Sequence, residues 1–384
     1  MKKWILKEFK SSSKHLEISK RFNLSAEIVQ ILINRNIEEY EKIDFFLNPK
    51  LNNLYQPDLM KDLQKGAERV LKAIENNEII AIHGDYDVDG ITATALLSDL
   101  FKKIGVNAIA FIPNRFEDGY GLNVKAIEEF KEKGVNLIIT VDCGISAFPA
   151  CDKAKELGID LIITDHHEPK EVLPSAYAII NPKQVECTFP DKKLAGVGIA
   201  FYFAAVIRNL AEKSSFLNNI KIDIKDYIDL VTLGTVADVS DVLGLNRILI
   251  KKGLPLIEMS KRVGISALIE IAGLSGKKIS YGNVAFHLAP RLNASGRLSS
   301  ANKALSLLTT NNRDEANNIA KELDLENRER QKIEKKTIKD AILKIEEISD
   351  FDQKKTIVLG SSSWHPGVIG IVASRLVEKY GRPT

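Results

Sequence analysis

The sequence predicts an α/β protein in which a parallel β-sheet carries helices on both faces. A long connecting helix and the start of a second, smaller α/β domain are expected to follow it. Two observations lead to this prediction. Short apolar runs rich in Ile and Val alternate with helical patterns over the first half of the chain, and the segment 314–348 contains neither Gly nor Pro. Strands that alternate with helices are typical of a buried parallel sheet.

The chain has 384 residues, a length that suggests two or three domains. We expect a helical N-terminal segment over residues 1–60, which becomes irregular near NPKLNNLYQPDLM. The main α/β domain and a helical extension are predicted over 61–310. The connecting helix is predicted over 311–349, and the start of the C-terminal domain over 350–384.

Five apolar runs are the candidate strands of the sheet, and helical patterns over 90–105, 123–134 and 146–158 separate the first four of them. Connections between parallel strands are right-handed, so the order of the strands is strongly constrained. The runs cover residues 78–85, 107–114, 136–144, 160–167 and 176–182.

Helices dominate the rest of the chain. The segment 196–213 is apolar nearly all round and is expected to be buried, and 225–241 is expected to form a helix with an acidic end. The segment 314–348 is predicted to be one helix about 50 Å long that bridges two domains. After it we expect a strand, a loop and a helix, which cannot close a core alone and therefore indicate a domain that is truncated at Thr384.

Composition narrows the class of protein. Hydrophobic residues make up 45% and charged residues 27%, which is ordinary for a globular protein. The three cysteines fit neither a zinc site nor a disulfide framework, so a cytoplasmic location is expected. The N-terminus lacks the apolar region of a secretory signal, and no run reaches the roughly 20 apolar residues of a membrane span.

The charge distribution points to a polyanionic partner. The formal net charge of the chain is only +3, but nine Lys or Arg stand against two Glu between Lys251 and Lys303, a local net charge of +7. A local basic field can hold nucleic acid when the whole chain is nearly neutral. An ordinary solvated surface explains the same charges equally well.

The segment His83-Gly-Asp85-Tyr-Asp87-Val-Asp89-Gly begins where the first apolar run ends. Ligands of open α/β sheets bind at the carboxyl ends of the strands. Three aspartates within five residues repel one another when they are ionised, unless cations neutralise them. Alternation in an extended segment places these side chains on one side, so the sequence predicts a multidentate metal site.

Two further strand ends carry metal-binding residues, and Asp238 can supply another carboxylate. In the third run the strand NLIITV ends in Asp142, and in the fourth the strand DLIIT ends in Asp165-His166-His167. Parallel strands bring these ends together, so Asp142 and His166 should converge on the first cluster. The number of carboxylates suits two divalent ions, and the oxygen-rich set favours Mn²⁺ first and Mg²⁺ as the alternative.

These segments resemble a known family. DYDVDG, TVDCG, TDHH and VADVSD occur in the order of the motifs of the DHH phosphoesterases. HGDYDVDGITATALL, PNRFEDGYGL, APRLNASGRL, ENRERQKIE and WHPGVIGIVASRLVEKYGRP resemble the RecJ exonucleases within that family. The resemblance covers roughly residues 50–384 and implies a DHH-type sheet, a connecting helix and a DHH-associated C-terminal domain, with the site in the cleft between them.

The resemblance also implies roles for individual residues. Asp142 is implied to bridge the two ions, Asp85 to be an additional or alternative ligand, and His167 to face the scissile phosphate. Arg115 and Arg297 resemble positions that hold DNA phosphates. Arg291 is also predicted to bind the substrate. His365 is predicted to be either a substrate contact or a structural residue. The implied metal ligands are His83, Asp87 and Asp142 for one ion, and Asp89, Asp142, His166 and Asp238 for the other.

The function implied by the resemblance is 5′→3′ hydrolysis of single-stranded DNA to 5′-mononucleotides by a two-metal mechanism, in DNA repair and recombination. Single-strand-binding protein and a helicase are the implied protein partners. Two alternatives stay open, namely another DHH phosphoesterase (an oligoribonuclease or a cyclic-dinucleotide phosphodiesterase) and an inactive DNA-binding relative. A dinucleotide-binding Rossmann protein is excluded, because the first strand–helix turn is acidic and lacks a glycine-rich loop.

Overall fold

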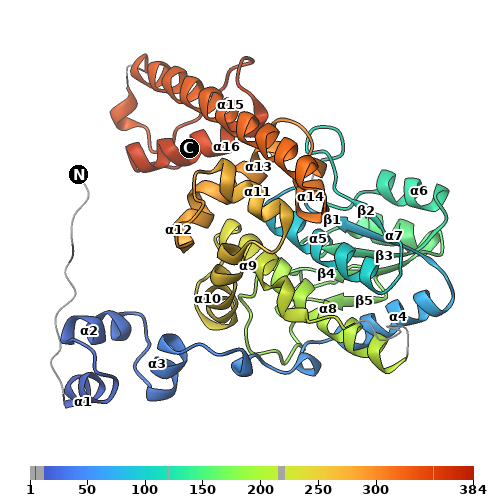
Figure 1. The fold of residues 1–384 in the computed structure, drawn as a ribbon. Coiled ribbons are helices and arrows are strands. Elements are labelled where there is room, and N and C mark those ends of the chain that lie inside the picture. The colour runs from blue at the N-terminus through green and yellow to red at the C-terminus, as the bar shows by residue number, and fades with distance from the viewer. Residues whose placement is uncertain (1–4, 6–12, 120, 215–220, 349) are drawn as a thin grey trace.

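The computed structural model describes residues 5, 13–119, 121–214, 221–348 and 350–384. Its centre is a five-stranded sheet in the order β2-β1-β3-β4-β5, in which all neighbouring strands are parallel (Figure 1). The five predicted runs all form strands of this sheet. The strands are β1 Ile79–Gly84, β2 Ile109–Phe111, β3 Val135–Val141, β4 Asp160–Thr164 and β5 Ala178–Ile180.

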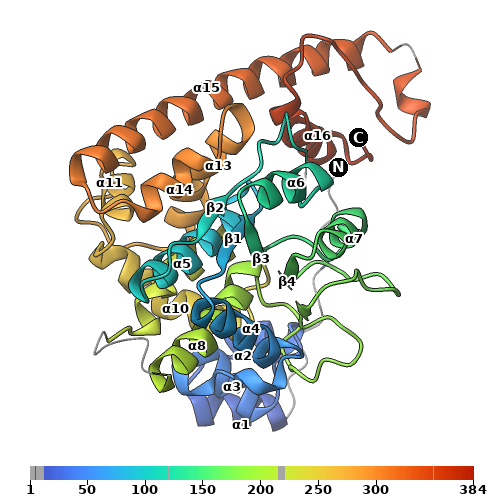
Figure 2. The same cartoon turned by 90° about the vertical axis from the view of Figure 1, so that its right-hand side faces the viewer.

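Helices cover both faces of the sheet, as predicted (Figure 2). On one face, α4 (Leu63–Glu75), α5 (Val88–Lys103) and α8 (Gly196–Lys213) bury the larger apolar core. On the other face, α6 (Val124–Glu132) and α7 (Phe148–Glu156) bury a smaller one. Successive residues of a strand point to opposite faces, so the continuous Ile and Val runs supply both cores.

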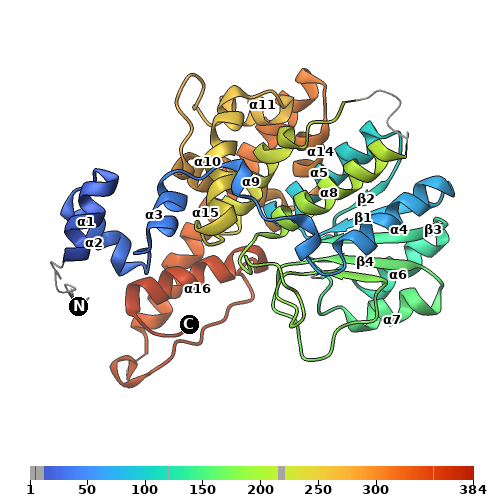
Figure 3. The same ribbon diagram turned by 90° about the horizontal axis from the view of Figure 1, so that it is seen from below.

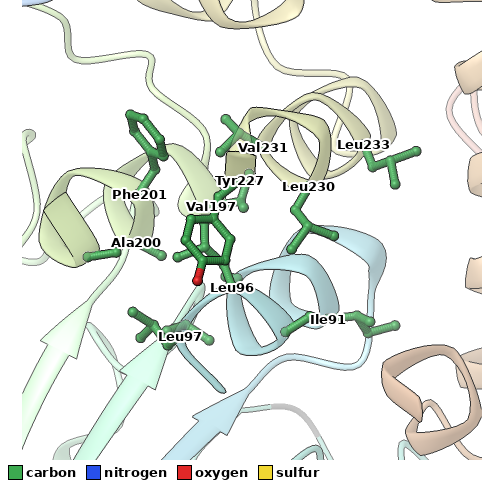
Figure 4. Close-up of a cluster of buried hydrophobic side chains, with 14 of the residues drawn as sticks. Ile91, Leu96, Leu97, Val197, Ala200, Phe201, Tyr227, Leu230, Val231 and Leu233 are labelled. Carbon is green, nitrogen blue, oxygen red and sulfur yellow. The ribbon is translucent and has the colours of Figure 1, made fainter. Parts of the chain in front are cut away.

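A second layer of helices packs on the larger core. The 3₁₀ turn η3 (Ile224–Tyr227) and helix α9 (Ile228–Ala237) lie against α5 and α8, and α10 (Gly244–Met259) lies against α9. Figure 4 shows the contact, where Leu96 and Ile91 of α5 face Leu230 of α9. Because these side chains are fully buried, this packing holds the N-terminal end of α5 in place.

A further group of helices leads into the long connecting helix. Helix α15 (Arg313–Glu346) begins at Asn312, whose side chain accepts hydrogen bonds from the backbone N–H groups of Asp314 and Glu315. It packs against α11, α13 and α14 and, further along, against α16 (Figures 1 and 2). The preceding elements are α11 Val263–Ile271, α12 Tyr281–Asn283, the π-helix η4 Val284–Leu288, α13 Ala289–Leu298 and α14 Asn302–Thr309.

The C-terminal region departs from the prediction in one respect. It contains the 3₁₀ turn η5 (Phe351–Gln353) and α16 (Pro366–Tyr380), but the strand expected before α16 is not formed. Ile357 donates a single backbone hydrogen bond to Pro383, and no strand pairs with this segment among the described residues. A strand is stable only beside a partner, so the apolar run alone was not sufficient. A small core that includes Ala341 and Leu376 joins α15 to α16.

Three N-terminal helices form a group that lies apart from the sheet (Figure 3). The helices α1 (Ser13–Phe22), α2 (Ala26–Asn34) and α3 (Tyr40–Leu47) share a small core around Ile18 and Ile43. The 3₁₀ turns η1 (Leu51–Asn53) and η2 (Pro57–Leu59) lead from them to α4. The predicted domain boundaries remain a proposal. Among the described residues, none of the helices has the length and apolar character that crossing a membrane requires.

Candidate metal centre

The turn between β1 and α5 brings acidic side chains to the carboxyl edge of the sheet. Asp87 is the N-cap of α5, and its carboxylate accepts hydrogen bonds from the backbone N–H groups of Asp89 (2.9 Å) and Gly90 (3.1 Å). A Cβ at Gly90 would lie 2.5 Å from the backbone nitrogen of Asp85. The turn is therefore so tight that it requires glycine, and it holds Asp85, Asp87 and Asp89 close together.

The N-terminus of α8 closes the cluster from the other side. The Asp89 carboxylate accepts hydrogen bonds from the backbone N–H groups of Gly196 (2.8 Å) and Val197 (2.9 Å). A helix N-terminus stabilises such a negative charge. A Cβ at Gly196 would lie 2.6 Å from Oδ1 of Asp142, so the helix reaches this carboxylate only because the residue is glycine. Asp142 itself is buried and has a positive φ of 60°.

Three groups of side chains have the geometry of a metal site, and within each group the ligand atoms lie within 4.8 Å of one another. Asp142 belongs to two of the groups but not to the group of Asp89, His166 and Asp238, so its role as the bridge between two ions stays a prediction. His166 also belongs to two, and its Nε2 lies 3.1 Å from Oδ1 of Asp142. The groups are Asp85, Asp87 and Asp142; Asp89, His166 and Asp238; and Asp142, His166 and His167.

The carboxylates of the cluster raise one another's pKa values. Burial and the neighbouring Asp87 raise the pKa of Asp85 to about 7. Burial, followed by the charges of neighbouring aspartates, also raises the pKa values of Asp89 and Asp142 well above their ordinary range. Each shift records that the ionised form is costly without a counter-charge. A bound cation supplies that charge.

Four buried polar atoms of the cluster form no hydrogen bond among the described residues, although two of them, Nε2 of His166 and Oδ1 of Asp142, lie 3.1 Å apart. Buried polar groups are nearly always paired, so such atoms need an explanation. Oxygen and imidazole donors match the ligand preferences of Mn²⁺ and Mg²⁺. The residues present therefore fit divalent cations. The atoms are Nε2 of His83, Oδ1 of Asp85, Oδ1 of Asp142 and Nε2 of His166.

His83 lies outside the three groups. Its side chain is fully buried at the end of β1, beside the rings of Phe111 and Phe130, and its Nδ1 lies 3.7 Å from Sγ of Cys143. Burial lowers the pKa of His83 to about 4, so the ring is neutral, as a ligand must be. Its role as a ligand remains a prediction.

Asp165 is the residue whose role the sequence analysis missed. It is 1% exposed, and its Oδ1 accepts hydrogen bonds from the backbone N–H (3.0 Å) and the ring Nδ1 (2.7 Å) of His167. Its Oδ2 accepts a hydrogen bond from the backbone N–H of Ile145 (2.9 Å). The hydrogen bond to Asp165 raises the pKa of His167 and orients its ring. The sequence signal that could have identified this role is the position of a carboxylate directly before the two histidines.

Two of the predicted phosphate-binding arginines lie beside the cluster. The guanidinium of Arg115 lies 5.1 Å from the centre of the Tyr86 ring. Nη1 of Arg297 donates a 3.3 Å hydrogen bond to the backbone oxygen of Gly367. Burial, followed by the charges of the nearby Arg115 and Arg330, lowers the pKa of Arg297.

The other two predicted substrate contacts have structural partners. Arg291 forms an ion pair with Asp324 at 2.9 Å and donates to the backbone oxygen of His287, which ties α13 to α15. His365 is the N-cap of α16, where its Nδ1 accepts a hydrogen bond from the backbone N–H of Gly367 (3.0 Å). Its ring also lies edge-on to Phe116, with 5.5 Å between the ring centres.

Part of the positive charge of the stretch 251–303 is paired within the protein, and its role in holding nucleic acid stays a prediction. Several of its cations pair with acids elsewhere in the chain, and such pairs cannot be read from local sequence. The pairs are Lys261 with Asp226, Arg262 with Asp229, Arg291 with Asp324, and Lys303 with Glu322 and Glu326.

Residues 79–235 match the model of the DHH family, N-terminal domain. The chain is 39% identical to the single-stranded-DNA-specific exonuclease RecJ of Bacillus subtilis over 367 residues, which are 95% of this chain and 45% of that protein. It is 40% identical to the Escherichia coli protein of the same name over 333 residues, 84% of this chain and 57% of that protein. The chain thus spans about half the length of the curated relatives it matches.

The fold is similar to solved structures. It matches the crystal structure of an exonuclease RecJ bound to manganese with a TM-score of 0.75 and 35% identity, over 84% of this chain and 79% of that chain. It also matches RecJ from Thermus thermophilus in complex with Mn²⁺, with a TM-score of 0.80 and 31% identity, over 96% of this chain and 51% of that chain.

Proposed function

This chain belongs to the RecJ family of DHH proteins, and we propose that it hydrolyses phosphodiester bonds of single-stranded DNA. The proposed direction is 5′→3′, with release of 5′-mononucleotides in DNA repair and recombination. The observation that carries the proposal is the convergence of aspartates and histidines from β1, β3, β4 and α9 on one edge of the sheet. The same chemistry is common to DHH phosphoesterases, so the preference for DNA rests on family membership.

Two divalent cations, Mn²⁺ or Mg²⁺, are proposed as the cofactor. The groups that include Asp87 and Asp89 would each hold one ion, with Asp142 shared and with His83 as a further candidate ligand. Such ions supply an activated water and charge stabilisation for in-line displacement at phosphorus.

His167 and the two arginines supply the remaining contacts in this proposal. Because Asp165 occupies Nδ1 of His167, the ring's Nε2 is the atom that would donate to a non-bridging phosphate oxygen or to the leaving oxygen. Arg297 and Arg115 carry the planar donor fork that matches phosphate, and they would bind the phosphates next to the scissile bond. Arg291 and His365 remain proposed substrate contacts, although Arg291 pairs with Asp324 and Nδ1 of His365 accepts a hydrogen bond from Gly367.

The test is hydrolysis of single-stranded oligodeoxynucleotides labelled at the 5′ or 3′ end, in Mn²⁺. We expect the 5′ label to appear at once as a mononucleotide while the 3′-labelled strand shortens gradually. Asp142→Ala should abolish the activity, since it removes the shared ligand. Release of the 3′ label first, or full activity in Asp142→Ala, would contradict the proposal.

A second candidate is another DHH phosphoesterase, an oligoribonuclease or a cyclic-dinucleotide phosphodiesterase, because the acidic cluster serves these reactions equally well. Parallel assays with short RNA and cyclic dinucleotides separate them from the proposed activity. An inactive DNA-binding relative is disfavoured, because every motif position carries a residue able to bind a metal. We propose that the protein acts in the cytoplasm with a single-strand-binding protein and a helicase.

A further inference from the structure

We propose that Cys143 prepares His83 to bind a cation. Its sulfur accepts a hydrogen bond from Nδ1–H of His83, which leaves the lone pair on Nε2 for the ion. The inference deepens the proposed function and rests on it for the presence of divalent ions at the acidic cluster. Cys143 contributes no ligand atom in this arrangement and touches no substrate, so it is a positioning residue.

The turn after β3 returns Cys143 to the ring of His83. In the parallel pairing of β1 with β3, His83 lies opposite Thr140. Oγ1 of Thr140 donates a 2.8 Å hydrogen bond to the backbone oxygen of Cys143, and Gly144 has a φ of 112°, which glycine adopts without strain. The chain therefore turns directly after the strand and leaves the Cys143 side chain buried beside β1.

Two contacts link the thiol to this histidine. Sγ of Cys143 lies 3.7 Å from Nδ1 of the His83 ring and 3.8 Å from the His83 backbone oxygen. The thiol has one proton, which it donates to the backbone oxygen, so the lone pairs of the sulfur remain to accept Nδ1–H. Both the donor and the acceptor of the cysteine are thus used on one residue.

The second ring nitrogen explains what these contacts achieve. Nε2 of His83 is buried and forms no hydrogen bond among the described residues. A neutral imidazole carries one proton, and on Nε2 it would be a buried donor without an acceptor, which is unfavourable. With the proton on Nδ1, Nε2 presents a lone pair, as a metal ligand must. A histidine that binds a metal almost always donates its other N–H to a neighbouring acceptor.

The other neighbours of the ring do not select a tautomer. The ring centres of Phe111 and Phe130 lie 5.3 and 6.4 Å from that of His83, and these side chains have no polar atoms. Within the described part of the chain, Sγ of Cys143 is the side-chain atom that Nδ1 contacts. The sulfur belongs to none of the three groups with metal-site geometry, so its role is to orient a ligand and not to be one.

The first experiment measures metal affinity by calorimetric titration of the 384-residue chain with Mn²⁺, without DNA. Cys143→Ala should weaken the binding of one ion roughly 10- to 100-fold, the usual effect of removing a residue that orients a ligand. Cys143→Ser keeps a donor and an acceptor at the same place and should retain most of the affinity. Parent affinity in Cys143→Ala would overturn the proposal.

The matched control is Cys151→Ala. Cys151 is also fully buried, but it lies on α7 in the smaller core and contacts no predicted ligand among the described residues. This variant loses the same atom from an equally buried site, so it should keep the parent affinity for Mn²⁺. An equal loss of affinity in Cys151→Ala and Cys143→Ala would show that the effect comes from core packing, and would also overturn the proposal.

A double-mutant cycle tests whether Cys143 acts through His83. In a His83→Ala chain, Cys143→Ala should cause no further loss of Mn²⁺ affinity, because the ring that it orients is absent. If Cys143→Ala weakened Mn²⁺ binding equally with and without the His83 ring, the cysteine would act on its neighbour Asp142 instead, and the assignment would be wrong.

The tautomer can be measured without any metal. In the chain labelled with ¹⁵N-histidine, in EDTA, two-bond ¹H–¹⁵N spectra distinguish Nδ1–H from Nε2–H, and His83→Ala identifies the signal. We expect Nδ1–H in the parent chain and in Cys143→Ser, and a population of Nε2–H in Cys143→Ala. A proton on Nε2 in the parent chain would overturn the proposal, even where Cys143→Ala does not fold.

These outcomes are independent of DNA hydrolysis. A parent chain that binds Mn²⁺ and has the Nδ1–H tautomer, but leaves single strands intact, would overturn the proposed function and leave the assignment of Cys143 standing.

Discussion

At the scale of single residues, the pair Asp165–His167 has a catalytic-site geometry that neither residue has alone. Asp165 is buried, and both of its carboxylate oxygens accept hydrogen bonds. Two of these three hydrogen bonds are donated by His167. The ring of His167 is 46% exposed and thus accessible to a substrate. A buried carboxylate that orients an accessible imidazole fixes which ring nitrogen faces the reacting groups. Asp165 is therefore a positioning residue.

The first residue-scale prediction separates positioning from metal binding. His167→Ala should slow turnover by roughly 10²–10⁴, the usual contribution of a positioned acid, while KM changes little. Asp165→Asn should lower kcat less than His167→Ala does, because the imidazole ring is still present but is less firmly oriented. Calorimetric titration with Mn²⁺ should give the parent stoichiometry for both variants. Loss of one bound ion in His167→Ala would show that His167 is a ligand, as its place beside Asp142 and His166 also allows.

At the scale of elements, the contact between α13 and α16 depends on a glycine. A Cβ at Gly367 would lie 2.1 Å from the backbone oxygen of Arg297, so the first turn of α16 packs directly on the end of α13. The same turn accepts the hydrogen bond from Nη1 of Arg297 through the Gly367 oxygen. The docking of α16 therefore sets the position of an arginine that borders the acidic cluster.

The element-scale prediction compares two glycines of this helix. Gly367→Ala should force α16 away from α13, destabilise the chain by about 1–3 kcal/mol, and reduce activity through Arg297. Gly370→Ala is the matched control, because a Cβ there meets no atom within 4 Å. It should stabilise the chain by about 0.4–1 kcal/mol, since alanine favours a helix more than glycine does. Urea denaturation of both variants checks this, and equal destabilisation would contradict the contact.

At the scale of the whole molecule, the buried acidic cluster destabilises the fold until a cation binds. Carboxylates from β1, β3 and α9 meet at the sheet edge, and burial raises the pKa values of Asp89 and Asp142. The surrounding core, which includes the contact of α5 with α8 and α9, holds these groups together in spite of their repulsion. Binding of cations should therefore stabilise the entire main domain.

The whole-molecule prediction concerns thermal unfolding. Mn²⁺ at 100 times its dissociation constant should add about 2.7 kcal/mol to the free energy of unfolding, and EDTA should remove the gain. Asp142→Ala is the control, because it should lose the Mn²⁺-dependent shift while its stability in EDTA stays equal or rises through relief of repulsion. Differential scanning calorimetry measures both. An equal Mn²⁺ shift in Asp142→Ala would place the ions elsewhere.

Local sequence patterns were sufficient to predict the parallel sheet, the helices on both faces, the long helix and most of the acidic cluster. These features follow from local patterns, since each strand is an apolar run of its own and the acidic motifs that begin at Asp85, Asp142 and Asp165 each directly follow a strand, whereas Asp238 follows helix α9. Parallel pairing then brings the strand ends to one edge whatever the details of packing. Asp142 and His166 were predicted to converge for this reason, and their side chains lie 3.1 Å apart.

Features that depend on partners distant in sequence could be seen only once the chain was folded. Part of the positive charge of the stretch 251–303 is paired, because Asp229, Asp324 and Glu326 reach it from other helices. The run around Ile357 formed no strand, because no neighbouring strand lies beside it among the described residues. The pocket that Phe286 lines exists only where η4, α13, α15 and α16 meet. Ion pairs, strand pairing and cavities are properties of two or more segments in contact, so no single segment encodes them.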